Sequence, residues 1–179
     1  DFYIETKSEI HIEELCKKLN GNKNRDSNFY VINAIVIYWS QKMIKQLQEK
    51  KLKVSDFSDF FIKILKMLDN DNRDHLINSM LNELRFPSNQ TIFFHYLMIY
   101  IMNEIKNEII EEHIIRNIIG RLIFKPNPWG LVHFFVQLMK NGKYVIMKRP
   151  FILKNKADEL LQKISLSVKN KKKKNYISN

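Results

Sequence analysis

The sequence predicts an all-α protein in which antiparallel helix pairs stack as a HEAT-like α-solenoid of about eight helices. Apolar residues recur every three or four positions along most of the 179 residues, which is the period of a helix and not of a strand. The four prolines and four glycines punctuate these stretches, and the connections are short, which favours antiparallel neighbours. No repeat of fixed period is visible, so a compact irregular bundle is the structural alternative.

Two helices are predicted before residue 50. A short one covers residues 10–19 and ends at Asn20-Gly21, after which the sequence is polar to Asn28. The next covers residues 29–48, and its first half, YVINAIVIYW, is apolar on nearly every side. A helix of this kind is normally buried, so we expect it at the centre of the fold.

Two further helices follow, each opened by a short polar residue. Ser55 or Asp56 is placed to cap the third helix, and Asp71 or Asn72 the fourth, because such side chains accept hydrogen bonds from the first free N–H groups. Apolar spacing predicts the inward residues, which are Phe57, Phe61, Ile64 and Leu68 in the third helix and Leu76, Ile77, Met80, Leu81 and Leu84 in the fourth.

Pro87 ends the fourth helix, because a proline disfavours helical geometry in the residue before it, and Ser88 can then cap the fifth. The fifth helix contains IFFHYLMIYIM, residues 92–102, which is too short to span a bilayer and therefore reads as a core helix. In the sixth, isoleucine pairs at 109/110, 114/115 and 118/119 follow helical steps, and the helix is expected to end near Phe124.

The corner KPNPWG, residues 125–130, separates the sixth and seventh helices. Pro126 closes the first of them, Asn127 is a favoured N-cap, and Pro128 suits the first helical position. Gly130 weakens a first turn by up to about 1 kcal/mol, so it predicts a close backbone approach or room for Trp129 to fold back. We expect Trp129 to be first a wedge between helix pairs and second a partner contact.

The last part of the chain predicts two helices and a tail. The seventh helix ends at Asn141-Gly142, an amphipathic segment covers residues 143–152, and a final helix covers 154–168. The expected division is an N-terminal helix and polar linker (1–27), a helical domain (28–168) and a basic disordered tail (169–179). The inward residues are Leu131, Val132, Phe134, Phe135 and Leu138 in the seventh helix, and Ala157, Leu160, Leu161 and Ile164 in the last.

Composition indicates a single globular domain, with 45% hydrophobic and 27% charged residues. The single cysteine, Cys16, cannot form an internal disulfide, so a reducing compartment, the cytoplasm or the nucleus, is expected. The chain opens at Asp1 without a methionine, from which we expect a fragment of a longer protein.

The residues give little support for an enzyme. The histidines show no H-E-x-x-H or E-x-x-H spacing, no glycine-rich phosphate loop exists, and Cys16 is expected to pack in the core, so neither a metal nor a cofactor is predicted. His95 and His133 lie in apolar helices and are expected in the core or a groove, while Glu111-Glu112-His113 is expected on a solvated helix face. The five histidines are His11, His75, His95, His113 and His133.

Nucleic-acid binding is the second class considered. The net charge is +11, and five of these charges lie in the tail, so an auxiliary RNA contact there would weaken steeply with salt. A tail that only reflects composition is the alternative. The aromatic and methionine residues follow core spacing instead of forming a base-stacking platform. The tail residues are Lys169, Lys171, Lys172, Lys173 and Lys174; the core candidates are Phe93, Phe94, Phe134, Phe135, Met80, Met98, Met102 and Met139.

Two blocks carry a resemblance to a known family. The segments LINSMLNELRFPSNQTIFFHYLMIYIM (76–102) and RLIFKPNPWGLVHFFVQLMKN (121–141) resemble the C-terminal Not domain, or superfamily homology domain, of the Not-one scaffold subunit of the Ccr-Not deadenylase complex. Weaker similarity extends over residues 28–165. The chain departs from the family at Gln90, where a histidine is usual, and over residues 144–147, which lack an aromatic F-x-F-W. The matching motif residues are Pro87, Thr91, Pro126, Pro128, Trp129 and Gly130.

The resemblance implies a HEAT-like array without catalytic residues. Such a domain would dock the Not-two and Not-three/five subunits through extended segments, and the assembly would support mRNA deadenylation, decay and translational repression. The rest of the complex would be reached through the chain upstream of Asp1. A generic HEAT-type adaptor or an RNA-binding module is the alternative. The expected groove anchors are Tyr96, Tyr100, Trp129 and Tyr144, with Arg85, Arg121 and Lys140 as flanking polar contacts.

Overall fold

The computed structural model of the chain describes residues 10–49, 54–122 and 128–140. These residues form seven α-helices and no strand, which confirms the predicted all-α class. None of the described helices is both long and apolar enough to cross a membrane. The predicted segments over 143–152 and 154–168 lie outside the described residues. The helices are α2 (Ile10–Gly21), α3 (Arg25–Gln48), α4 (Val54–Met67), α5 (Asn70–Asn82), α6 (Asn89–Glu104), α7 (Glu108–Leu122) and α8 (Trp129–Lys140).

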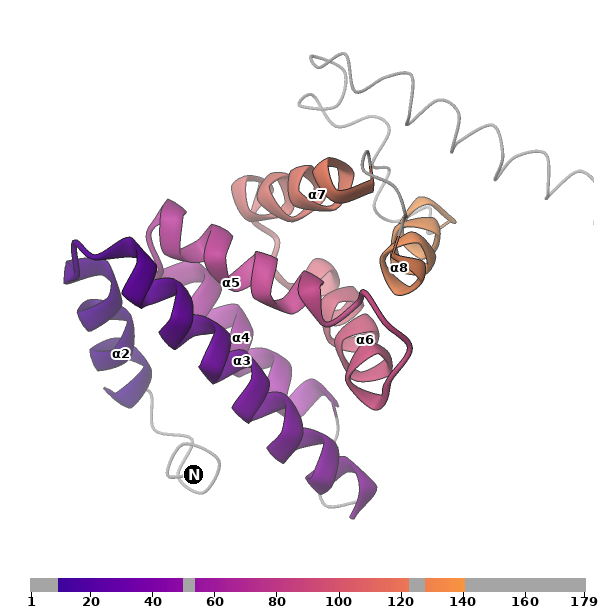
Figure 1. The fold of residues 1–179 in the computed structure, drawn as a ribbon, viewed down its shortest axis with the longest axis horizontal. Coiled ribbons are helices and arrows are strands. Elements are labelled where there is room, and N and C mark those ends of the chain that lie inside the picture. Colours follow the sequence, from indigo (N-terminus) through magenta and orange to yellow (C-terminus); the bar gives the residue numbers. More distant parts are fainter. Residues whose placement is uncertain (1–9, 50–53, 123–127, 141–179) are drawn as a thin grey trace, which may run out of the picture.

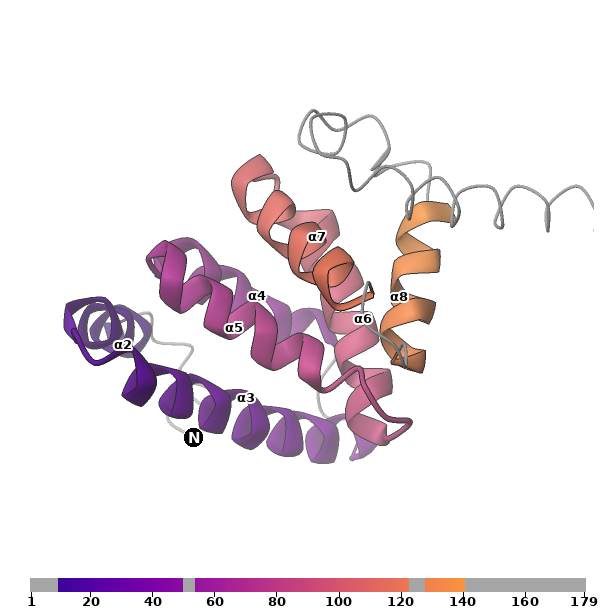
Figure 2. The same cartoon turned by 45° about the horizontal axis from the view of Figure 1, so that its top comes forward.

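The helices form two layers, because each packs mainly against the helix two places along the chain. One layer contains α2, α4, α6 and α8, and the other contains α3, α5 and α7, with α3 also contacting α6. In Figures 1 and 2, α3, α5 and α7 follow one another in front of α4 and α6. Stacking of alternate helices is the architecture of an α-solenoid, as predicted, and not of an irregular bundle.

The core lies between the two layers. Phe61, Phe94, Phe134 and Phe135 are its largest side chains, each almost fully buried. The predicted inward faces of α4, α5 and α8 are buried as expected, except that Val132 is half-buried and the side chain of Phe57 is outside the described set. Cys16 packs in this core, and burial raises the pKa of its thiol to about 11.

The expectation that α3 is buried on all sides is wrong. Its inner face, with Ile32, Val36 and Met43, is buried, but Tyr30 and Tyr38 on the opposite face are 71% and 46% exposed. The physical reason is the position of α3 in its layer. It is the first described helix of that layer, so only one of its faces is covered.

Helix starts differ from the predicted ones at three places. The α3 helix begins at Arg25 and is capped by Asn24, whose side chain accepts a hydrogen bond from the Ser27 N–H at 3.2 Å. Asp69, and neither Asp71 nor Asn72, caps α5 through the Asn72 N–H at 2.9 Å. The α4 helix begins at Val54, so Ser55 and Asp56 lie inside its first turn.

A buried amide pair explains why Asn72 does not cap α5. Asn28 Nδ2 donates to Asn72 Oδ1 at 3.0 Å and to the Leu19 carbonyl at 2.9 Å, and Asn72 Nδ2 also donates to Leu19 at 3.2 Å. The pair joins the end of α2 to the beginnings of α3 and α5. Because both side chains are almost fully buried, their hydrogen bonds must be satisfied internally.

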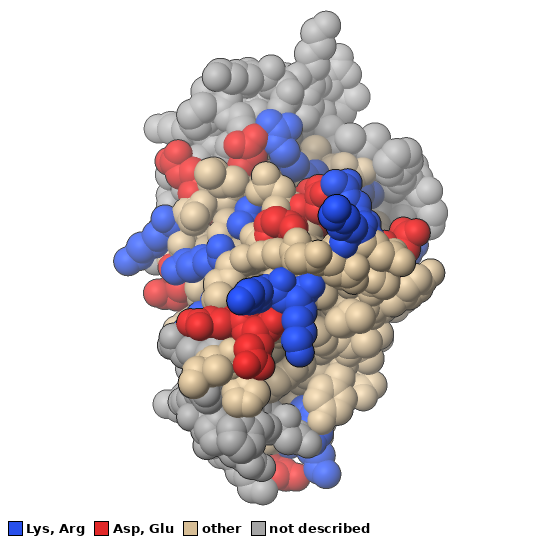
Figure 3. Space-filling model, turned by 90° about the vertical axis from the view of Figure 1, so that its left-hand side faces the viewer, with Lys and Arg blue, Asp and Glu red and all other residues tan. Residues whose placement is uncertain are grey.

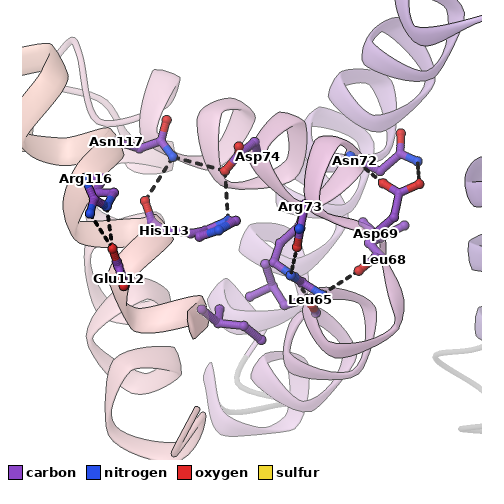
Figure 4. Close-up of polar contacts among 12 residues, drawn as sticks. Leu65, Leu68, Asp69, Asn72, Arg73, Asp74, Glu112, His113, Arg116 and Asn117 are labelled. Carbon is purple, nitrogen blue, oxygen red and sulfur yellow. Dashed lines mark hydrogen bonds and ion pairs between the residues drawn. The ribbon is translucent and has the colours of Figure 1, made fainter. Parts of the chain in front are cut away.

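The α5 and α7 helices are joined by a ladder of polar side chains, part of which Figure 4 shows. His113 Nδ1 and Asn117 Nδ2 lie 3.1 Å and 3.3 Å from Asp74 Oδ1. One helical turn further, Arg121 donates to Asn78 Oδ1 at 2.8 Å and to Asn82 Oδ1 at 2.7 Å. Spacing of four residues on both helices keeps these partners on facing sides.

This ladder corrects the expectation for Glu111-Glu112-His113. Glu111 is buried and His113 faces α5, so only Glu112 fits a solvated face, where it pairs with Arg116.

Arg73 caps the C-terminal end of α4 by donating to the Leu65 and Leu68 carbonyls at 2.7 Å and 2.6 Å (Figure 4). A cation at a helix C-terminus is favourable because the last carbonyls there lack helical partners.

Candidate docking groove

The first turn of α8 packs directly against the corner between α5 and α6. A Cβ atom at Gly130 would lie 2.5 Å from the Leu84 carbonyl oxygen and 2.7 Å from Thr91 Cγ2. Only glycine fits so close to backbone, which confirms the predicted close approach. The contact also joins the two sequence blocks that carried the family resemblance.

Hydrogen bonds of the buried Thr91 stabilise the same corner. Its N–H donates to Ser88 Oγ at 3.1 Å, so Ser88 caps α6 as predicted. The buried Thr91 hydroxyl contacts the Phe86 carbonyl and lies 3.0 Å from the Glu83 carbonyl, to which it donates. These bonds fix the loop against which α8 packs.

Of the three motif prolines, the structure describes Pro87 and Pro128. The Pro128 carbonyl accepts the Val132 N–H at 3.0 Å, so Pro128 stands immediately before the helix, one residue earlier than predicted. Pro87 lies exposed in the α5–α6 corner. Pro126 and Asn127 lie outside the described residues.

A groove runs between α6 and α8 on the outer side of their layer. Its volume is about 360 Å³, and most of its lining is apolar. The α6 wall includes Ile92, Tyr96 and Ile99, and the α8 wall includes Trp129 and His133. The remaining lining residues are Thr91, His95, Gly130 and Gln137.

Trp129 lies at this groove and is 61% exposed. Its ring stacks on that of His133, with centroids 5.6 Å apart and planes 15° from parallel. The interpretation of Trp129 as a buried wedge is therefore wrong. Gly130 makes the close contact with the corner, and Trp129 presents its ring to solvent.

Two histidines face each other across the groove. The ring centroids of His95 and His133 are 5.0 Å apart. Burial, and then the nearby His133, lower the pKa of His95, so its neutral form is favoured at neutral pH. In the described parts of the chain no group of three or more His, Cys, Asp or Glu residues is arranged to hold a metal ion.

The Not1 family, described as "CCR4-Not complex component, Not1", matches residues 1–165. The chain belongs to the Not1 family. The CCR4-NOT transcription complex subunit let-711 of Caenorhabditis elegans is 31% identical over 132 residues, which are 69% of this chain and 5% of that protein. General negative regulator of transcription subunit 1 of Schizosaccharomyces pombe is 32% identical over 92 residues, 49% of this chain and 4% of that protein.

A solved structure supports the same fold for this Not1-family chain. The NOT1 superfamily homology domain from Chaetomium thermophilum matches with a TM-score of 0.75 and 21% identity, over 90% of this chain and 35% of that one. This chain therefore spans about a twentieth of the curated relatives and about a third of the solved domain.

The groove brings together some of the residues predicted as partner contacts in this Not1-family chain. Tyr96 and Trp129 line it and are 60% and 61% exposed, whereas Tyr100 is half-buried against the core. Lys140 is exposed at the end of α8. Tyr144 and the tail residues Lys169, Lys171, Lys172, Lys173 and Lys174 lie outside the described residues.

The two predicted arginine contacts have different surroundings. Arg85 is exposed beside the corner, with its guanidinium 5.8 Å from the centroid of the exposed Phe86 ring. Arg121 instead donates to Asn78 and Asn82, so it serves as an internal tie between α7 and α5.

Sequence reasoning missed Ile92, which is 61% exposed on the α6 wall. Its spacing of four residues from Tyr96 on an otherwise buried helix was the available signal.

Proposed function

We propose that this chain is a non-catalytic scaffold domain of a CCR4-NOT complex, acting in mRNA deadenylation, decay and translational repression. Membership of the Not1 family supports this proposal, as does the α-solenoid architecture, which presents long surfaces for partners. We place the protein in the cytoplasm or the nucleus, where such a complex would act.

The partners proposed are the Not-two and Not-three/five subunits, which would lay extended segments in the α6–α8 groove. The observation that carries this step is the gathering of three large apolar side chains, Ile92, Tyr96 and Trp129, each about 60% exposed, at one groove. Exposed apolar side chains around a concavity are typical of protein-binding sites, and a few such anchors contribute most of the binding energy.

The test is a binding titration with the purified heterodimer of the two partner subunits. We expect the wild-type chain to bind the heterodimer with a dissociation constant in the micromolar range or lower. Tyr96→Ala should raise this dissociation constant at least tenfold, which corresponds to a loss of about 1.4 kcal/mol in binding free energy. Calorimetry or co-purification would measure this.

A matched control is Tyr30→Ala, because Tyr30 is 71% exposed on α3, away from the groove. It should leave the affinity unchanged. Absence of binding by the wild-type chain at micromolar concentrations would reject the proposed function, and equal losses in the two variants would reject the groove as the site.

A further inference from the structure

The charge of the groove depends on its two histidines. The described lining contains no Asp, Glu, Lys or Arg, and besides His95 and His133 its one titratable side chain is the phenol of Tyr96. Histidine is the side chain that ordinarily changes charge between about pH 5 and 8. Protonation of this histidine pair therefore converts an uncharged groove into a cationic one.

The aromatic surroundings of His95 oppose its protonation. Its ring is half-buried and packs edge to face with the rings of Tyr96 and Phe134, at centroid distances of 5.8 Å and 5.7 Å. These rings displace water that would solvate an imidazolium, so burial penalises the charged form.

The second histidine adds electrostatic repulsion. The centroids of the His95 and His133 rings are 5.0 Å apart, so a proton on one ring disfavours a proton on the other. Burial, followed by repulsion from His133, lowers the pKa of His95 below its ordinary value of 6.5. Both effects favour the uncharged groove.

The charged residues of the neighbouring helices lie outside the lining. Within their described spans, α6 has only Glu104 and α8 only Lys140, each in the last turn of its helix. No carboxylate of α3, α4 or α7, the other helices packed on α6 or α8, contributes to the lowered pKa of His95. The described titratable and charged residues of these three helices include Arg25, Asp26, Lys42, Lys45, Asp59, Lys63, Lys66, Glu108, Glu111, Glu112, His113, Arg116 and Arg121.

We propose that the groove docks its partner segment with both histidines neutral, and that protonation of the pair releases the segment. The proposal rests on the proposed function and adds a means of regulation to the same site. The Trp129 ring stacks on His133, so a segment that contacts Trp129 also lies beside the histidine pair. An apolar segment there removes more water from the histidines, which makes a charge on them costlier in the complex than in the free chain.

The direction of the pH dependence follows from this difference. Affinity should be highest above about pH 6.5, where an ordinary imidazole is mostly neutral. It should fall as the pH decreases below that value, because the free chain takes up protons that the complex excludes.

The experiment measures the dissociation constant of the partner heterodimer at about pH 7.5 and pH 5.5. For the wild-type chain we expect it to be about three- to tenfold higher at the lower pH. This ratio should shrink in both His95→Gln and His133→Gln, because glutamine is uncharged at both pH values. His11→Gln is the matched control and should keep the wild-type ratio, since His11 is exposed on α2, outside the groove.

A second measurement needs no partner. The histidine ring protons of the wild-type chain and of His133→Gln are titrated by NMR between about pH 5 and 8. Removing His133 should raise the pKa of His95, because the repulsion is lost. An unchanged pKa of His95 would contradict the coupling of the two rings on which the inference depends.

The binding outcomes separate this inference from the proposed function. No binding of the heterodimer by the wild-type chain at the higher pH would reject both. Binding that is equally tight or tighter at the lower pH would reject the inference alone. A loss of affinity at the lower pH that is undiminished in both groove variants would also overturn it, because the protons would then bind elsewhere.

Discussion

Gly130 allows the first turn of α8 to meet the backbone of the α5–α6 corner. The space that a Cβ atom would need is taken by the Leu84 carbonyl oxygen, 2.5 Å away, and by Thr91 Cγ2. Because one of these atoms belongs to the backbone, the obstruction cannot be relieved by a change of rotamer. The groove depends on this contact, since Thr91 and Gly130 both line it.

We predict that Gly130→Ala lowers the free energy of unfolding by about 1–3 kcal/mol, because the clash outweighs the higher helix propensity of alanine. Urea denaturation followed by circular dichroism would measure it. Gly120→Ala is the matched control. Gly120 lies exposed in α7, and apart from its chain neighbours and the backbone of its own helix no atom lies within 4 Å of the added Cβ, so alanine there should stabilise the protein by up to about 1 kcal/mol. Stabilisation by both substitutions would contradict the close approach.

The corner also shows which residue roles the sequence could predict. Glycine in a first helical turn is unfavourable, so its presence at Gly130 required a local reason, and a close approach was the natural one. Trp129 gave no such signal. Its spacing suits either face of α8, and only the packing of α8 on the corner decides that the ring stacks on His133 at the groove.

At the scale of helices, α5 and α7 are held in register by polar side chains as well as by the core. Arg121 makes hydrogen bonds to Asn78 and Asn82 from a half-buried position. Removing one partner of such a group costs more than the net strength of a single hydrogen bond, because the acceptors left behind are partly desolvated.

We predict that Arg121→Met, which retains the aliphatic stem, lowers the free energy of unfolding by about 1–3 kcal/mol. Arg116→Met on the same helix is the control, because the Arg116–Glu112 pair is an exposed i,i+4 pair worth about 0.3–0.5 kcal/mol. Chemical denaturation of the two variants would compare them. Equal effects would show that the ladder adds no more than a surface pair.

Element types were predictable from the sequence, but several boundaries and faces were not. Apolar spacing located every described helix, whereas the start of α5 depended on Asn72 being held by Leu19 and Asn28, contacts distant in the sequence. The outer face of α3 is the clearest example of a feature that the sequence could not predict. Its all-round apolar sequence indicates burial, and only the arrangement of layers shows which side remains uncovered.

At the scale of the molecule, two layers of alternately packed helices make stability a sum of neighbour contacts. The α2 helix packs mainly on α4, whereas α5 has neighbours on both sides in its layer, α3 and α7. Figure 3 views the end of the molecule at α2, where basic and acidic side chains are interspersed and no broad surface of one sign appears.

We predict that amide hydrogen exchange is slower in α5 and α6 than in α2, because α2, the first described helix, has fewer described neighbours whose contacts must break when it opens. Exchange measured by mass spectrometry under native conditions should give protection that falls towards α2. Uniform protection across the described helices would indicate that the array opens only as a single cooperative unit.

The contact between Gly130 and the Leu84 carbonyl has a genetic consequence. Changing the side chain at position 84 leaves the carbonyl oxygen in place, so no substitution there relieves a Gly130→Ala defect. Thr91→Ser would remove the second obstructing atom, Cγ2, and leave the first. A screen for intragenic suppressors of Gly130→Ala should therefore yield mainly revertants to glycine, together with distant changes that raise stability generally.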